Sequence, residues 1–383
     1  MKFCSDFSIY IHFPFCNSFC SYCSFPRIKF ERTLVNQYMV QLGRELDYYS
    51  SWVTDKKCIS IYIGGGNPGL IPLTLLNTLE KMLASKFDLS SLREFTLEIN
   101  PENMNKNLIN YFDASMINRL SMGVQTLHNP QATGRRHDST QVEKAVSLIH
   151  ASKINNFNLD LIFGLPDNPL SVQKQTIAKL CTFSPKHISF YGLGIEKGCK
   201  YYEEEKLGYK IAPTETEWID FYLEGREQLI ENGFGQYEIS NYSQTGFPSL
   251  HNLGYWLGQN YIGVGSAAGS RWDKMRWYNF FPPQEYLKID FRNKNRPNSV
   301  LTDEYEELDN FEIYKERVMT EMRLTSGLRR DKLVNSCLSL KKLENLLKKD
   351  YIWAADDRIG LTVQGMLVSD SIFQTLMSQP NPL

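Results

Sequence analysis

The sequence predicts an α/β protein whose core is an open, partial (β/α)6 barrel, followed by an α+β extension and a small C-terminal module like a winged helix. Short runs of β-branched and aromatic residues alternate six times with amphipathic stretches along the first half of the chain, a pattern typical of parallel strands joined by helical crossovers. The units recur at roughly 30-residue intervals, as barrel units do. Glycines, acids, amides and cysteines follow the ends of these runs, where a barrel gathers functional side chains.

The strands and helices of the core are predicted from hydrophobic periodicity. The six predicted strands are residues 7–13, 58–63, 94–99, 118–124, 157–163 and 187–193. The four predicted helices are residues 34–49, 73–87, 141–154 and 171–183. Six units, where a closed barrel has eight, indicate a barrel that stays open.

Two domain boundaries are expected. The barrel is predicted over residues 1–210, the α+β extension over 211–300 and the C-terminal module over 301–383. The end of the chain has the order helix, short strand, Asp-Asp turn, short strand, helix, which is why it resembles a winged helix. We expect this module to serve in packing and to carry no chemistry.

The charge of the chain is balanced, with 42 Lys and Arg against 43 Asp and Glu. This gives no electrostatic footprint for a nucleic acid or an anionic lipid surface. No run of about 18 apolar residues is present, and Asp6 and His12 interrupt the apolar N-terminal stretch, so a signal-peptide pattern is missing. We therefore expect a cytoplasmic protein with no integral membrane segment, a compartment in which disulfides rarely persist.

The segment "FCNSFCSYCSF" holds three of the eight cysteines, Cys16, Cys20 and Cys23. A structural zinc site prefers four protein ligands, so three thiols indicate a site one ligand short. A [4Fe–4S] cluster fits better, because one loop can place a thiolate on each of three irons. The fourth iron is then left for an exogenous ligand. A structural iron–sulfur or zinc site remains the alternative.

S-adenosylmethionine suits that fourth iron, because its amino and carboxylate groups can chelate a metal. Electron transfer into its sulfonium breaks a C–S bond and yields a 5′-deoxyadenosyl radical, chemistry that belongs to the cofactor. Glycines after the second strand allow close backbone approach to such a ligand, and polar side chains near other strand ends supply donors and acceptors. The candidate residues for this cofactor are Tyr22, Gly65, Gly66, Glu98, Gln125, Arg135, Asp160, Gly194 and Gly269.

The runs that carry these residues resemble a known family. "YIHFPFCNSFCSYCSF", "IGGGNP", "LEINPE", "RLSMGVQT", "GRRH" and "NLDLIFGLP" are similar to those of radical S-adenosylmethionine proteins related to oxygen-independent coproporphyrinogen III oxidase. "QYEISNY", "HNLGYW" and "MRLTSGL" resemble the haem chaperones of that group. The resemblance extends from about residue 8 to the C-terminus. It implies a partial barrel of the radical S-adenosylmethionine type, a cluster on the three cysteines and a cofactor site that includes Tyr10 and Asn67 beside the residues named above.

Three positions depart from the family pattern or leave a choice. Asn67 stands where the family has threonine, although it still offers hydrogen-bonding atoms. A one-residue deletion after Gln125 leaves Arg135 and Arg136 as rivals for the same contact. Phe25 stands where the oxidases carry a further cysteine, and the haem chaperones share this phenylalanine.

The segment "HNLGYW", residues 251–256, is the motif that the resemblance connects with haem. His251 offers an imidazole nitrogen to iron, and Tyr255 and Trp256 offer flat faces to a porphyrin. The plain alternative is a turn whose aromatic side chains pack into the core.

Three functions are therefore compared. The first is a [4Fe–4S] and S-adenosylmethionine protein that binds haem as cargo and passes it to acceptors such as respiratory cytochromes, with an electron donor as a further partner. The second is oxygen-independent coproporphyrinogen III oxidase, the one that implies ordinary enzymatic turnover. The third is a structural iron–sulfur or zinc protein that cleaves no cofactor. The missing fourth cysteine and His251 favour the first.

Overall fold

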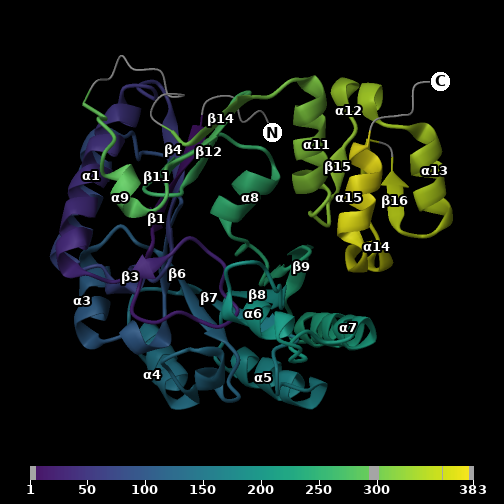
Figure 1. Cartoon of the computed structure of the whole chain (residues 1–383), viewed down its shortest axis with the longest axis horizontal. Coiled ribbons are helices and arrows are strands. Elements are labelled where there is room, and N and C mark those ends of the chain that lie inside the picture. Colours follow the sequence, from purple (N-terminus) through teal and green to yellow (C-terminus); the bar gives the residue numbers. More distant parts are fainter. Residues whose placement is uncertain (1–5, 293–301, 356, 379–383) are drawn as a thin grey trace.

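A computed structural model describes residues 6–292, 302–355 and 357–378. The core is a mixed α/β arrangement around one twelve-stranded sheet (Figure 1). Six parallel strands form its centre and lie side by side in chain order, which confirms the predicted core. These strands are β1 (Asp6–Phe13), β4 (Lys57–Gly65), β5 (Glu94–Ile99), β6 (Arg119–Gln125), β7 (Asn156–Phe163) and β8 (His187–Gly192).

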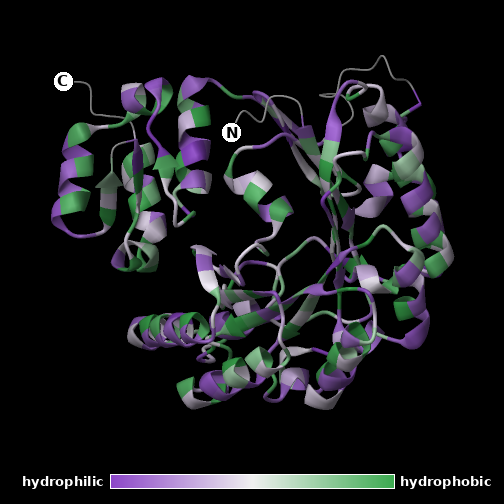
Figure 2. Ribbon diagram, turned by 180° about the vertical axis from the view of Figure 1, so that it is seen from behind, coloured by the Kyte–Doolittle hydropathy of each residue, from purple (hydrophilic) through white to green (hydrophobic). Residues whose placement is uncertain are grey.

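Helices between these strands cover the outer face of the sheet (Figure 1). They are α1 (Arg32–Ser50), α2 (Leu73–Lys86), α3 (Lys106–Ala114), α4 (Ser139–His150) and α5 (Leu170–Thr182). The four predicted helices are confirmed. Helix α3 was not predicted because its nine residues give little more than two turns of periodicity. Figure 2 shows hydrophilic and hydrophobic residues alternating along these helices, as expected where one face is buried.

Segments after residue 210 extend the sheet at both edges. Beside β1 lie β11 (Tyr261–Val264), β12 (Gly269–Trp272), β13 (Met275–Tyr278) and β14 (Glu304–Glu307). Beside β8 lie β10 (Asn241–Ser243) and β9 (Gly235–Glu238). The strands expected in a separate extension thus belong to the same sheet as the core, and α9 (Pro283–Tyr286) follows β13.

The domain division at 210 and 300 stays a prediction. Residue 210 lies between α6 (Lys200–Lys206) and α7 (Glu215–Glu231). Residue 300 lies outside the described residues.

The central strands turn apolar side chains outward and polar ones inward. On β6, Leu120, Met122 and Val124 are fully buried under the outer helices, whereas Arg119 and Ser121 face the interior of the sheet. This alternation follows from the two-residue period of a strand. The inner face of the open barrel is therefore polar and suited to a polar ligand.

Helix α8 (Leu250–Trp256), which carries the whole "HNLGYW" segment, lies between the sheet and the C-terminal module (Figure 1). Glu94 of β5 holds its N-terminus. The carboxylate accepts hydrogen bonds from Leu250 N–H at 2.9 Å, His251 N–H at 3.1 Å and Ser249 Oγ–H at 3.3 Å. Unpaired N–H groups at a helix start favour such an anion.

The C-terminal module combines helices with a three-stranded sheet of order β15-β17-β16. Its predicted order of helix, strand, strand and helix is confirmed, and residue 356 of the predicted turn lies outside the described residues. The elements are α11 (Asn310–Glu321), β15 (Leu328–Arg329), α12 (Lys332–Cys337), α13 (Leu340–Lys348), β16 (Ile352–Ala355), β17 (Arg358–Leu361), α14 (Val363–Leu367) and α15 (Ser369–Met377). In the part of the chain that is described, no helix is long and apolar enough to cross a membrane.

Candidate functional site

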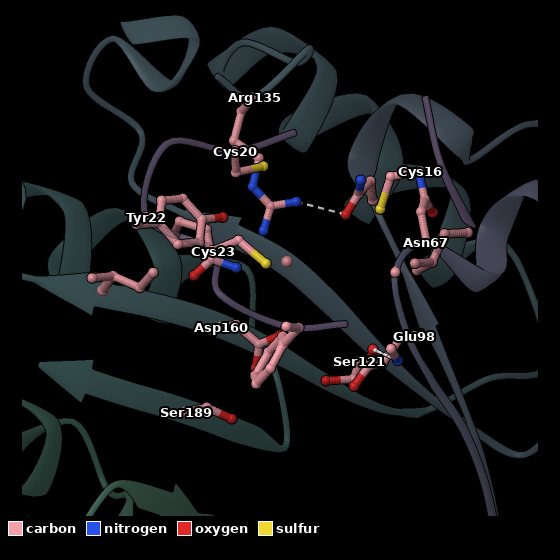
Figure 3. A pocket seen from close by; sticks show the side chains of 18 of the residues that line it. Cys16, Cys20, Tyr22, Cys23, Asn67, Glu98, Ser121, Arg135, Asp160 and Ser189 are labelled. Atoms are coloured by element: carbon pink, nitrogen blue, oxygen red, sulfur yellow. Dashed lines mark hydrogen bonds between the residues drawn. The ribbon is translucent and has the colours of Figure 1, made fainter. Parts of the chain in front are cut away.

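A cavity of about 390 Å³ opens at the carboxyl ends of the central strands. Side chains from the cysteine loop and from the ends of β4, β5, β6, β7 and β8 line it (Figure 3). The structure thus brings together residues that are far apart in the sequence. The predicted residues in its lining are Cys16, Cys20, Tyr22, Cys23, Gly65, Gly66, Asn67, Glu98, Gln125, Arg135, Asp160 and Gly194.

The cysteine loop is held from three sides. Two short parallel strands, β2 (Phe15–Cys16) and β3 (Ile28–Lys29), join its ends. In the middle, Ser21 N–H donates to the Thr133 carbonyl at 2.8 Å, and the Ser21 carbonyl accepts from Tyr201 N–H at 2.9 Å. Figure 3 shows the three cysteine side chains around one space. The loop is therefore shaped to present three thiols to one ligand.

Two of the thiols, Cys16 and Cys23, lie in an environment that opposes their ionisation. Burial raises the pKa of Cys16 to about 12, and the neighbouring Cys23 and Cys20 add to this effect. Burial also raises the pKa of Cys23, although Arg27 opposes it. A bound iron centre would displace these protons and stabilise the thiolates. Among the described residues, no three His, Cys, Asp or Glu side chains converge on a point that one metal ion could occupy. A multi-iron cluster takes each thiolate on a different iron and needs no such convergence.

Arg135 reaches from the segment after β6 toward the cysteines (Figure 3). Its Nη1 donates to Asn100 Oδ1 at 2.6 Å, and its guanidinium lies 5.8 Å from the centre of the Tyr22 ring. Gly123 makes room for it, because a Cβ built there would lie 2.8 Å from Arg135 Nη2. Arg136 also lines the cavity but is exposed to solvent.

Glu98 stands at the end of β5 and faces the cavity (Figure 3). It accepts hydrogen bonds from Tyr62 Oη–H at 2.8 Å and from Gly65 N–H at 3.0 Å. Burial raises its pKa to about 7, and the charge of Asp160 adds to the rise. Glu98 can therefore change its charge near neutral pH, in contrast to an exposed glutamate.

The glycines after β4 are required by their surroundings. Gly65 adopts a φ of +114°, a conformation that other residues rarely take. A Cβ on Gly66 would lie 2.8 Å from the Phe15 carbonyl oxygen, so only glycine lets this turn pass beside β2. Next to it, Asn67 Nδ2 donates to Asn103 at 2.9 Å, while the buried Asn67 Oδ1 has no partner among the described residues. That oxygen is a free acceptor in the wall of the cavity.

Two other predicted residues lie outside the lining of the cavity. Tyr10 is half-buried on β1, where its hydroxyl lies 2.8 Å from His12 Nδ1. Its ring centre is 6.2 Å from that of Tyr62, which does line the cavity. Gly269 begins β12, and a Cβ on it would meet the Tyr278 ring at 2.8 Å. The structure therefore places Gly269 in strand packing, opposite Tyr278 of β13.

His251 is also separate from the cavity, and it is 1% exposed. Its Nδ1 lies 2.9 Å from Ser60 Oγ, and its Nε2 lies 2.8 Å from Tyr255 Oη. Burial lowers its pKa to about 3, so the ring is neutral at physiological pH. Trp256 of the same motif lies against the Arg323 guanidinium, 4.8 Å from the ring centre. In this conformation the motif matches the plain alternative of aromatic side chains packed into the core.

Several residues in the cavity wall were not singled out from the sequence. They lie on inward-facing positions of the same strands and on α8. A strict two-residue period counted back from Gln125 and Asp160 would have found those on β6 and β7. The residues are Tyr62, Arg119, Ser121, Asn158, Ser189, Tyr191 and Asn252.

Comparison with known proteins agrees with this geometry. Residues 10–176 match the Radical SAM superfamily. The chain belongs to the radical S-adenosylmethionine superfamily, whose members use a [4Fe–4S] cluster and S-adenosylmethionine. The lining fits both groups, because its residues offer three thiols, the unpaired Asn67 Oδ1 and the carboxyl groups of Glu98 and Asp160.

More specific similarity extends over nearly the whole chain. A Lactococcus lactis protein named "Heme chaperone HemW" is 29% identical over 97% of both chains. A Bacillus subtilis protein of the same name is 27% identical over 97% of this chain and 99% of its own. The fold is similar to that of Escherichia coli coproporphyrinogen III oxidase (HemN), with a TM-score of 0.83, 19% identity, and coverage of 97% of this chain and 90% of that one.

Proposed function

We propose that this chain is a haem chaperone that binds haem and passes it to acceptor proteins. The observation that carries the proposal is the similarity over 97% of the chain to proteins named "Heme chaperone HemW". Phe25 supports it, because the oxidases to which the family is related carry a cysteine at this position. Phe25 lines the cavity and is 65% exposed, so it adds an apolar surface where a further thiol would stand.

We assign the cluster to Cys16, Cys20 and Cys23, and S-adenosylmethionine to the rest of the cavity. Glu98, when ionised, accepts hydrogen bonds from the amino group of the cofactor. Arg135 donates to its carboxylate, and Asp160 accepts from the ribose hydroxyls. When both groups are bound, the cluster supplies an electron for cleavage of the cofactor. An enzyme of this class requires cleavage of S-adenosylmethionine, whereas a chaperone requires only its binding.

For haem, we assign His251 as the iron ligand through Nε2. This requires the hydroxyl of Tyr255 to release that nitrogen, since the two atoms are 2.8 Å apart. The helix α8 that carries both residues has only seven residues, so a small displacement of it would expose the imidazole. Respiratory cytochromes are the proposed class of acceptor, with an electron donor for the cluster as a second partner.

The test begins with anaerobic reconstitution of iron and sulfide, followed by titration with haem. We expect a shift of the Soret band, its loss or alteration in His251→Ala, and transfer of haem from the loaded protein to an apocytochrome. Lack of any Soret shift in competent wild-type preparations would overturn the proposal. Wild-type behaviour of His251→Ala would remove the assignment of the ligand and leave the function.

The second candidate function is radical decarboxylation of coproporphyrinogen III. The fold similarity to the E. coli oxidase is the observation in its favour. An anaerobic assay with dithionite, S-adenosylmethionine and coproporphyrinogen III decides between the two. Stoichiometric formation of vinyl groups with release of carbon dioxide would replace the chaperone proposal, whereas we expect none above the reagent blank. Equilibrium dialysis with labelled S-adenosylmethionine separates both from a structural iron–sulfur protein, which would not bind it.

A further inference from the structure

Arg119 begins β6 and faces the inner end of the cavity, although it is 2% exposed. Its charge is poorly matched by its neighbours. The Nη1 atom makes one long hydrogen bond of 3.5 Å to Thr96 Oγ1, and Nε has no hydrogen-bond partner among the described residues. A buried charge is costly unless it is paired and hydrogen-bonded. Arg119 therefore has donors that remain free for a ligand.

The acidic residue closest to it is already engaged. Glu94 Oε2 lies 3.9 Å from Arg119 Nε, beyond hydrogen-bonding distance. The same carboxylate accepts three hydrogen bonds from Ser249, Leu250 and His251 at the start of α8. Glu94 thus balances the guanidinium only in part, because it is aimed at the helix.

Arg119 is the second guanidinium along the inward face of β6. The first, Arg135, lies over Gly123, and the four residue steps from Gly123 to Arg119 span about 13 Å along a strand. S-adenosylmethionine has one carboxylate, which Arg135 is placed to bind beside the cysteines. The acidic residues Glu98 and Asp160 pair with Ser121 and Gly123 in register and so lie nearer the mouth than Arg119. Arg119 therefore keeps only the long ionic contact with Glu94, and its Nε has no hydrogen bond among the described residues.

Two uncharged groups complete the surroundings. Asn158 Nδ2 donates to Ser121 Oγ at 2.8 Å, so the hydroxyl hydrogen of Ser121 is available to a further acceptor. Asn252 of α8 lines the same cavity from the opposite element. A planar guanidinium, with a hydroxyl and an amide in the lining of the same cavity, offers donors that suit a carboxylate.

We propose that Arg119, with Ser121 and Asn252, forms a subsite for the carboxylate of the molecule held beside S-adenosylmethionine. Resting on the proposed function, that carboxylate is a propionate of haem. Neither the three cysteines nor the "HNLGYW" imidazole forms this subsite, although Asn252 belongs to that motif.

The test compares haem with haem dimethyl ester, whose propionates carry no charge, on the reconstituted protein with S-adenosylmethionine present. Absorbance titrations give the two dissociation constants. We expect the wild type to bind haem about 10–100-fold more tightly than the ester, the range expected for one charge-assisted carboxylate contact. Arg119→Gln should reduce haem affinity by a similar factor and leave ester affinity unchanged. Arg119→Lys keeps the positive charge but loses the two parallel N–H donors of the guanidinium. Its affinity for haem should therefore lie between those of the wild type and Arg119→Gln.

Arg93→Gln is the matched control, because Arg93 is an exposed arginine just before β5, at the opposite end of the sheet from the cavity. It should bind both compounds as the wild type does. Equal affinity of the wild type for haem and its ester, or an equal loss of both in Arg119→Gln, would overturn the subsite while the chaperone function stands. Failure of the wild type to bind either compound would overturn the function itself. If Arg119→Gln does not fold, Arg119→Lys carries the same comparison.

Discussion

The Nδ1 atom of His251 lies 2.9 Å from Oγ of Ser60, a residue on β4 that is 191 positions away in the chain. Ser60 Oγ in turn lies 2.7 Å from Ser8 Oγ on β1. The imidazole therefore joins α8 to two central strands. A motif that the sequence connects with haem is also part of the wall of the barrel.

This arrangement predicts that His251→Ala destabilises the protein whether or not haem is present. Two buried hydrogen bonds are lost and Ser60 keeps fewer partners, which costs about 2–4 kcal/mol of unfolding free energy. Thermal or urea unfolding measures the loss. Tyr255→Phe is the matched variant, because it removes only the Nε2 partner and keeps Ser60. It should cost about 1 kcal/mol and retain the haem-induced Soret shift. Wild-type stability of His251→Ala would contradict the structural role of the imidazole.

The charge of Glu98 predicts how cofactor binding depends on pH. Its pKa of about 7 means that the carboxylate is ionised above pH 7 and protonated below it. Only the ionised form accepts hydrogen bonds from the amino group with both oxygens. Affinity for S-adenosylmethionine should therefore fall as pH decreases from 8 to 6, by at most about tenfold per unit below the pKa.

Glu98→Gln is the control for this titration. Its affinity for S-adenosylmethionine should be weaker and should change less with pH, because glutamine does not titrate. The titration of the cofactor itself affects both proteins equally. Equilibrium dialysis at several pH values gives the comparison. Parallel profiles for the two proteins would show that Glu98 is not the titrating group.

Gly123 predicts which arginine contacts the cofactor. A Cβ at this position would lie 2.8 Å from Arg135 Nη2, and the end of a long side chain can move away without disturbing the fold. Gly123→Ala should therefore keep the unfolding temperature near that of the wild type and weaken S-adenosylmethionine binding about 10–100-fold. Gly235→Ala on β9, where the nearest atom would be 3.7 Å away, is the control. Normal binding by Gly123→Ala together with weak binding by Arg136→Gln would transfer the contact to Arg136.

The central strands and most outer helices could be predicted because their hydrophobic periods are local properties of the sequence. The order of the outer strands could not. Strand β11 pairs with β1 in parallel across about 250 residues, with Ser8 opposite Tyr261, and no local pattern specifies such a neighbour. Pairing of this kind depends on the packing of the whole sheet.

The same distinction applies to the cavity. Residues at strand ends were identified because parallel strands bring their carboxyl ends to one edge. Arg119 and Ser121 were not, because a polar residue inside a strand ordinarily indicates a solvent-facing side. Only the open barrel, with a polar interior, turns these positions toward a ligand. The partners of His251 could not be identified either, since Ser60 carries no signal that distinguishes it from other serines.

The cysteine loop supports the most direct prediction about the metal centre. Each single replacement of Cys16, Cys20 or Cys23 by serine should abolish the cluster. The iron atom that loses its thiolate ligand would be left exposed to solvent. Iron and sulfide analysis of anaerobically reconstituted wild type should give about four of each per chain. Cys181→Ser is the matched control, since Cys181 is a half-buried thiol on the outer helix α5 and does not line the cavity. It should keep the full iron content and the same paramagnetic resonance spectrum after reduction. One tightly bound zinc and no sulfide in the wild type would instead establish the structural zinc alternative, and with it the loss of every prediction that involves S-adenosylmethionine.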